Sequence, residues 1–213
     1  MPIQIDSHRL VELIQPPHKV PLQIFHNVVP TVMLGSSVID TCDRFTLEMD
    51  HAGKFDYYEK ERAALKPTLD CSIGKIAEFG VHAMLMIACG YPDIKIDVGV
   101  YEKRSFDCDL PYNNAGEMGL SGIGVKSTST PRNLSWIVNR SNNFSTGGYD
   151  GTILDADGIT AFTYVCGNIV DLKAICPNSW LRNKGLFKEP YRKDKKGIKS
   201  AIYFSDMLEA TGN

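Results

Sequence analysis

The 213-residue sequence predicts a single α/β or α+β domain, in which helices come first, an antiparallel-rich sheet follows and a helix ends the chain. One observation behind this prediction is the helical periodicity of residues 72–89, which are mostly apolar. The other is a series of segments from residue 93 onward that are rich in β-branched and aromatic residues and separated by turns containing Gly and Asn. With 43% hydrophobic and 23% charged residues, the chain has the composition of a soluble globular protein.

Residues 1–66 are expected to form an extension that packs on the core, partly helical and partly irregular. Prolines interrupt its first half, where a short helix is predicted over residues 8–15. Residues 55–65 are acidic and aromatic and predict a further helix. The remainder, residues 67–213, is predicted to be the core domain.

The clearest helix is predicted over residues 72–89, with Ser72 as its N-cap and Gly90 as its stop. Its broad apolar surface predicts deep packing. A buried Glu78 on such a helix must be paired or bind a cation. The alternative is a partly exposed Glu78 near the N-terminal end of the helix, where the helix dipole favours it. His82, one turn later, is expected to be a packing residue.

The second half of the chain predicts strands and two short helices. Residues 93–109 alternate apolar and polar side chains, which predicts one bent strand or two short ones that end at Asp109. Further strands are predicted at residues 120–126, 134–139, 159–166, 169–176 and 201–204. Gly167-Asn168 is predicted to be a hairpin turn. The short helices are predicted at residues 177–185 and 205–210.

The hairpin formed by the strands around Asp109 and Lys126 is the first candidate site. Because strand side chains alternate, Asp107 and Asp109 share one face, and Lys126 shares a face with Gly124. An acid and a lysine on neighbouring strands are usually a solvated pair that contributes little to stability. Together with a helical glutamate, however, they suit a divalent metal, a phosphate and an attacking water.

This order of elements resembles that of the PD-(D/E)xK nucleases, the superfamily with the restriction-endonuclease-like fold. The matching segments are GKIAEFGVHAML with Glu78, FDCDL with Asp109 and GIGVKST with Lys126. The resemblance implies an α/β fold with a mixed central sheet flanked by helices. It also implies a Mg²⁺- or Mn²⁺-dependent endonuclease, of restriction, phage or repair type, that hydrolyses phosphodiester bonds in DNA. Glu78, Asp109 and Lys126 would be its catalytic residues.

The metal ligands implied by the resemblance are Glu78 and Asp109. The acid usually found two residues before the lysine is absent, because position 124 is Gly. A further carboxylate would then come from Asp107. An alternative uses the literal Pro-Asp pair at Pro92, with Asp93 or Asp97 as the ligand.

The net charge of −2 gives no global signal for nucleic-acid binding, but residues 173–199 are locally basic. Such a segment suits phosphate contacts that position a DNA duplex; the alternative is a solvated loop. The hydroxyls just after Lys126 could also donate to phosphate. The predicted DNA-binding residues are Ser127, Thr128, Lys184, Lys188, Arg192, Lys193, Lys195 and Lys196.

Cysteine spacing and the N-terminal residues indicate the compartment. The six cysteines are widely spaced and form no metal-binding pair, so we expect reduced thiols. The N-terminus has no basic region followed by an apolar one. We therefore expect a cytoplasmic protein that acts on duplex DNA, without a membrane partner. The sequence is compatible with both a monomer and a homodimer.

Two other functions remain compatible with the sequence. A protein with the nuclease fold could bind nucleic acid without cleaving it, with Gly124 as the cause. A structural or assembly protein could use its proline-rich N-terminal arm for contacts between copies. No Gly-rich phosphate loop, nucleophile elbow or HExxH motif occurs in the sequence.

Overall fold

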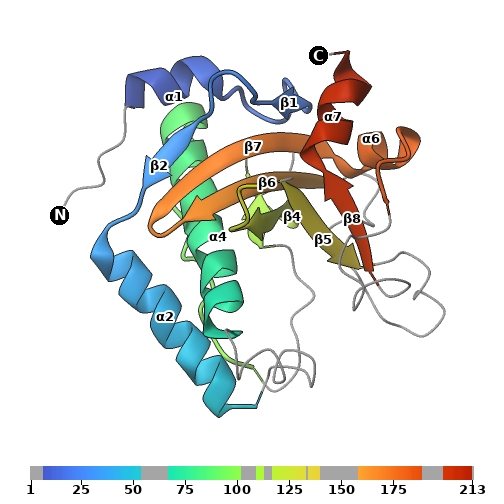
Figure 1. Cartoon of the computed structure of the whole chain (residues 1–213). Helices are drawn as coiled ribbons and strands as arrows, with labels where there is room; N and C mark the ends of the chain where they lie inside the picture. Colours follow the sequence, from blue (N-terminus) through green and yellow to red (C-terminus); the bar gives the residue numbers. More distant parts are fainter. Residues whose placement is uncertain are drawn as a thin grey trace.

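The computed structural model describes residues 7–53, 67–101, 109–112, 117–132, 134–139, 158–188 and 199–212. One face of its main sheet is crossed by the long helix α4 (Pro67–Cys89), and α2 (Ser36–His51) packs beside α4 (Figure 1). The opposite face packs on a small second sheet and two short C-terminal helices. The predicted arrangement of a mixed central sheet flanked by helices is therefore confirmed.

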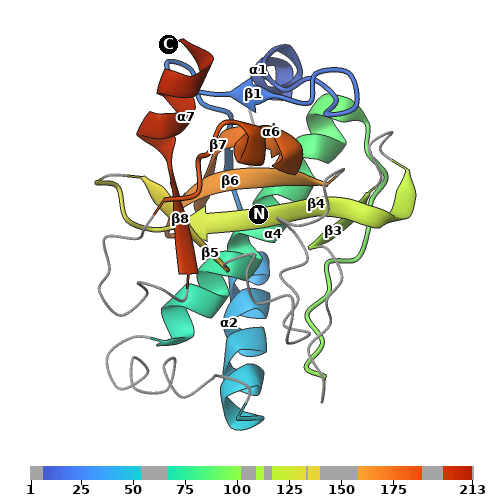
Figure 2. The same cartoon turned by 90° about the vertical axis from the view of Figure 1, so that its right-hand side faces the viewer.

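The main sheet has the strand order β1-β7-β6-β4-β3, and β2 also pairs with β7. Its strands are β1 (Gln23–Ile24), β2 (Thr31–Met33), β3 (Leu110–Tyr112), β4 (Met118–Thr128), β6 (Ile159–Cys166) and β7 (Ile169–Pro177). β4 and β6 run parallel, whereas the other pairs in this sheet are antiparallel. Figure 2 shows β4 as a long strand with the short β3 beside it.

The two central strands, β6 and β7, are those that the sequence predicted most closely. Both are covered on two faces, so their side chains are almost continuously apolar. The predicted turn at Gly167-Asn168 joins them, and Gly167 has a φ of 61°, which glycine adopts without steric cost.

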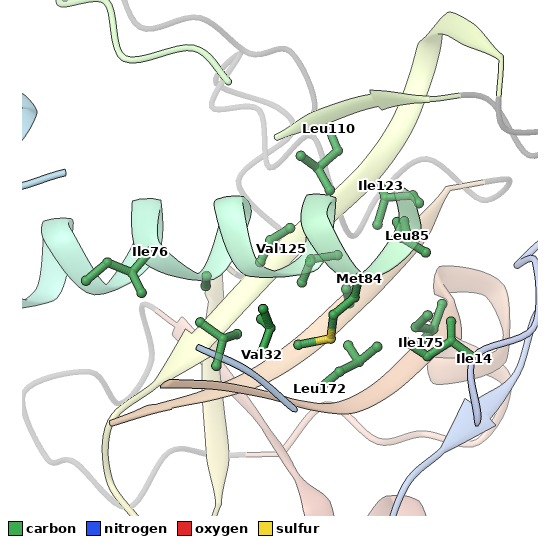
Figure 3. Packing of buried hydrophobic residues seen from close by; sticks show 14 of the residues in the cluster. Ile14, Val32, Ile76, Met84, Leu85, Leu110, Ile123, Val125, Leu172 and Ile175 are labelled. Carbon is green, nitrogen blue, oxygen red and sulfur yellow. The ribbon is translucent and has the colours of Figure 1, made fainter. Parts of the chain in front are cut away.

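The N-terminal residues contribute to the same core as α4 and the sheet. Helix α1 (Ser7–Leu13) begins close to its predicted start, and β1 and β2 both pair with β7. The side chains of Ile14 and Val32 lie among those of Met84, Leu172 and Ile175 (Figure 3). The boundary between an extension and a core domain at residue 66 stays a prediction.

Helix α4 begins at Pro67, so the prediction of Ser72 as its N-cap is wrong. Proline is common at the first helical position because its missing N–H has no intrahelical acceptor there. Ser72 is instead a buried helical residue whose hydroxyl donates to Asp43 Oδ1 on α2, at 2.7 Å. The helix ends as predicted, with Gly90 at a φ of 65°.

The prediction of a strand over residues 93–109 is wrong for the part that the structure describes. Residues 93–101 form no strand, and β3 begins after Asp109 instead of ending at it. The Asp97 carboxylate accepts hydrogen bonds from the Gly99 N–H and the Tyr101 hydroxyl, at 2.8 and 3.0 Å. Such local bonds offer the backbone an alternative to sheet pairing. Residues 102–108 lie outside the described residues.

The second sheet pairs β5 (Ser135–Asn139) with β8 (Lys199–Tyr203) in antiparallel register. The helices α6 (Asn178–Asn183) and α7 (Phe204–Thr211) complete this layer, close to their predicted positions. Trp136 joins the layers, because its indole N–H donates to Thr163 O at 2.8 Å and its ring packs on Phe162. The pairing of β6 with β7 shifts register between Phe162 and Thr163, next to this contact.

Residues Cys71–Cys89 of α4 are long and apolar enough to cross a membrane, and more than half of this segment is buried inside the protein. Packing against the sheet and α2 therefore accounts for the apolar character of the segment. The five cysteines in the described part of the chain are free thiols, as expected.

Candidate functional site

Glu78 is a buried carboxylate on the apolar helix α4, with 8% of its surface exposed. The Lys75 ammonium lies 2.7 Å from Glu78 Oε2, one helical turn earlier. The same ammonium lies over the Phe45 ring of α2, 5.1 Å from its centroid. The alternative of a partly exposed Glu78 is therefore wrong, and the cationic partner that a buried carboxylate requires is Lys75.

Asp109 lies where β3 begins and bonds directly to the neighbouring strand. The first residue of β3, Leu110, pairs with Ile123 of β4. Just before this pair, Asp109 Oδ2 accepts a hydrogen bond from the Val125 backbone N–H, at 2.6 Å. The carboxylate therefore lies against the backbone of β4, next to the residue that bears the predicted lysine.

Lys126 is half-buried on β4, and the backbone around it is held on both edges. On one edge, the Asp109 carboxylate binds the preceding N–H. On the other edge, Lys126 is in parallel register with Phe162 of β6, and its carbonyl accepts from the Thr163 hydroxyl at 3.2 Å. Strand alternation sets Lys126 and Gly124 on one face, as predicted.

Electrostatics link these three residues. Burial raises the pKa of Glu78 from 4.5 to about 8, and the negative charge of Asp109 is the second cause. Lys75 lowers this pKa through its charge and hydrogen bond, and the charge of Lys126 lowers it further. The charges of Asp109 and Lys126 thus act on the Glu78 carboxylate across the contact between α4 and β4. α4, the start of β3, and β4 together contribute two carboxylates and two lysines to this group.

The donor set can be compared with the needs of a Mg²⁺ or Mn²⁺ ion. Oxygen donors from two carboxylates suit these hard cations, and a cation would relieve the repulsion between Glu78 and Asp109. Among the described residues, no group of three or more His, Cys, Asp and Glu side chains could hold a metal. The described residues therefore offer an ion at most two side-chain ligands of these types, Glu78 and Asp109. The third predicted ligand, Asp107, lies outside the described residues.

The predicted DNA-binding residues are only partly described. Ser127 and Thr128 continue β4 directly after Lys126 and are half-buried. Lys184 and Lys188 are exposed, and in the part of the chain that the structure describes no contact joins them to the Glu78–Asp109–Lys126 group. The predictions for Arg192, Lys193, Lys195 and Lys196 fall on residues that are not described.

The alternative ligands Asp93 and Asp97 are engaged elsewhere. Asp93 Oδ1 lies 3.2 Å from His82 Nε2, and the other ring nitrogen of His82 lies 2.6 Å from Tyr112 Oη. Asp97 accepts the local bonds of its own turn. Asp109, unlike these two acids, is among the charges that act on the pKa of Glu78, and it bonds to the strand that bears Lys126. His82 is buried, as expected of a packing residue.

Sequence reasoning missed Lys75 as a member of the site. Its spacing from Glu78 is i, i+3, which brings two side chains together on a helix and could have indicated the pair. The contacts of His82 with Asp93 and Tyr112 carried no such signal, because they join segments that only the tertiary fold brings together.

Comparison of the chain with models of known protein families, with curated protein sequences and with solved structures gives no match. What can be inferred about its chemistry therefore rests on the sequence and on the geometry of this site.

Proposed function

We propose that this protein is a nuclease of the restriction-endonuclease-like kind that hydrolyses phosphodiester bonds in DNA with a Mg²⁺ or Mn²⁺ ion. The observation that carries the proposal is the hydrogen bond from the Val125 N–H to Asp109 Oδ2, which holds this carboxylate against β4 next to Lys126. The pKa of Glu78 agrees with it: burial and then the charge of Asp109 raise this pKa, and the charge of Lys126 lowers it. Both observations support the convergence of the three residues that the sequence resemblance selects. The mixed sheet, with Asp109 and Lys126 on neighbouring strands, is compatible with that fold.

In this proposal Glu78 and Asp109 would hold the ion, and Lys75 balances the charge of Glu78. A bound Mg²⁺ supplies polarisation of the phosphate and a lowered pKa of an attacking water. The Lys126 ammonium would orient that water or stabilise the negative charge that develops on the phosphate. The hydroxyls of Ser127 and Thr128 follow it on the same strand and would donate to neighbouring phosphates.

Nicking of supercoiled plasmid in Mg²⁺ tests this proposal. The wild-type protein is expected to nick the plasmid, and chelation of the metal should stop the reaction. Lys126→Met and Asp109→Asn should each lose at least about a hundredfold in rate, as expected for groups that act on the reacting phosphate. Asp97→Asn is the matched control, because this exposed acid is bonded within its own turn. Equal rates in the wild type and both site variants would contradict the assignment.

One observation favours a second candidate, a protein of the same fold that binds DNA without cleaving it. Position 124, on the Lys126 face of β4, lacks an acid, and the described residues hold no third carboxylate at the site. This candidate predicts salt-sensitive DNA binding and no nicking in either Mg²⁺ or Mn²⁺.

A further inference from the structure

A buried hydrogen-bond group joins the same two elements that carry Glu78 and Asp109. His82 follows Glu78 by one turn of α4, and Tyr112 follows Asp109 by three residues, at the end of β3. His82 Nδ1 and Tyr112 Oη lie 2.6 Å apart, and both residues are buried. This pair, with the Pro92 carbonyl and the Asp93 carboxylate, is called the His82 clamp below.

The β3 strand needs such an attachment. It has only three residues, lies at the edge of the sheet and pairs with β4 through a register shift. Few backbone hydrogen bonds therefore hold it in place. The ring of Tyr112 packs on Tyr91, with centroids 4.9 Å apart, and its hydroxyl donates to Pro92 O at 2.8 Å. The clamp thus fixes β3 both to α4 and to the segment that follows α4.

The hydrogen bonds of the clamp join its four groups in a chain. The Tyr112 hydroxyl donates to the Pro92 carbonyl, which can only accept. His82 contacts the Tyr112 hydroxyl through Nδ1 and the Asp93 carboxylate through Nε2. Both ring nitrogens of His82 therefore have partners within the clamp, one on β3 and one on the segment after α4.

The charged and titratable groups around His82 come from three segments. Asp93 faces it from the segment after α4, Tyr112 from β3, and Glu78 precedes it on α4. Burial, followed by the charge of Asp93, raises the pKa of Tyr112, so the tyrosine keeps its proton. The Asp93 side chain is 81% exposed, so the clamp runs from the surface to the core.

We propose that His82 and Tyr112 are positioning residues, which hold β3 on α4 and so keep the Asp109 carboxylate at β4 beside Glu78. This inference deepens the proposed function and rests on it for its consequence in catalysis. The positioning itself does not need a metal or DNA.

The Val125 amide reports on this positioning, because its N–H donates to Asp109 Oδ2. In Tyr112→Phe, hydrogen exchange of this amide should accelerate about tenfold, as expected when a hydrogen bond that restrains local opening is lost. Tyr91→Phe is the matched control: it removes a buried tyrosine hydroxyl that has no hydrogen-bond partner among the described residues. Equal exchange of the Val125 amide in the two variants overturns the proposal.

Asp93→Asn tests the other end of the clamp in the full chain. It changes an exposed residue, so it keeps the fold even if Tyr112→Phe does not. Exchange of the Val125 amide should accelerate in this variant as well, because Asp93 faces His82 Nε2. Exchange that Asp93→Asn leaves unchanged contradicts a role of Asp93 in the clamp.

The consequence for the site is tested by Mn²⁺ binding. Tyr112→Phe should weaken Mn²⁺ about tenfold, the lower end of the effect of losing a group that orients a metal ligand, while Tyr91→Phe should not. Unchanged Mn²⁺ affinity in Tyr112→Phe would contradict a role of the clamp at the site. Absence of Mn²⁺ binding in the wild type would instead overturn the proposed function, and the exchange of Val125 would still decide whether the clamp positions Asp109.

Discussion

The ionised form of Glu78 lowers the stability of the fold, whereas the proposed metal binding requires it. An ionised carboxylate in an apolar helix is unfavourable, and Asp109 adds like-charge repulsion. Lys75 offsets this only in part, since the pKa of Glu78 still rises to about 8. A group of this kind is typical of functional sites, where stability is reduced to keep a reactive arrangement.

The pH dependence of stability follows from this pKa. Below about pH 4.5, Glu78 is protonated in both the folded and unfolded chains. Between that value and about pH 8, the folded chain holds a proton that the unfolded chain has lost, so stability falls as the pH rises. Glu78→Gln resembles the protonated state and avoids this fall. Thermal unfolding should therefore give a higher Tm for Glu78→Gln near pH 9.

For a chain of this length, each kcal/mol of added stability should raise Tm by roughly 2–4 °C. The Tm difference between Glu78→Gln and the wild type should shrink toward pH 4.5. A difference that is the same at both pH values would mean that Glu78 is not the titrating group. Added Mg²⁺ should stabilise the wild type and not the variant, because an ion that binds only the folded state raises Tm.

At the scale of elements, the approach of α4 to the sheet sets the distance between Glu78 and the strands. Gly80 lies on the sheet side of α4, and a Cβ there would lie 2.7 Å from side-chain carbons of Val170 on β7. The lack of a side chain therefore lets helix and strand pack closely. Nothing lies within 4 Å of a Cβ at Gly74 on the same helix.

These two glycines give a matched pair of substitutions. Gly80→Ala should destabilise the protein by about 1–3 kcal/mol, because the helix or Val170 must move. Gly74→Ala should stabilise it by about 0.5–1 kcal/mol, because alanine favours the helix interior. Denaturant unfolding measures both. A stabilising Gly80→Ala would show that α4 does not pack against β7 at this distance.

The elements also show what the sequence could predict. β6 and β7 were predicted nearly to the residue, because each has a long run of β-branched and aromatic side chains beside a Gly-Asn turn. The start of α4 was missed, because Ser72 was predicted as its N-cap, whereas the helix begins at Pro67. The strand before Asp109 was wrong, because Asp97 forms local hydrogen bonds that alternation does not reveal.

The residues of the candidate site could likewise be predicted only in part from the sequence. Glu78, Asp109 and Lys126 could be selected from residue type and order, because their chemistry depends on those features. Lys75 and the His82 clamp could not, because they depend on how α4, β3 and the Pro92 segment pack.

At the scale of the whole molecule, the site exists only because the fold brings together elements that are distant in the chain. α4 supplies Glu78, the start of β3 supplies Asp109, and β4 supplies Lys126. The N-terminal residues support this arrangement, since β1 and β2 pair with the strand on which α4 packs. A nuclease that uses this site would therefore depend on the packing of α4 against the sheet.

Direct binding of Mn²⁺ to the full chain, followed by electron paramagnetic resonance near pH 9, tests this account most directly. At this pH Glu78 is ionised. The account predicts a Mn²⁺ site in the wild type that Glu78→Gln and Asp109→Asn each weaken by at least about tenfold, and that Asp97→Asn leaves unchanged. Binding of Mn²⁺ that is equally tight in Asp109→Asn and the wild type would contradict it.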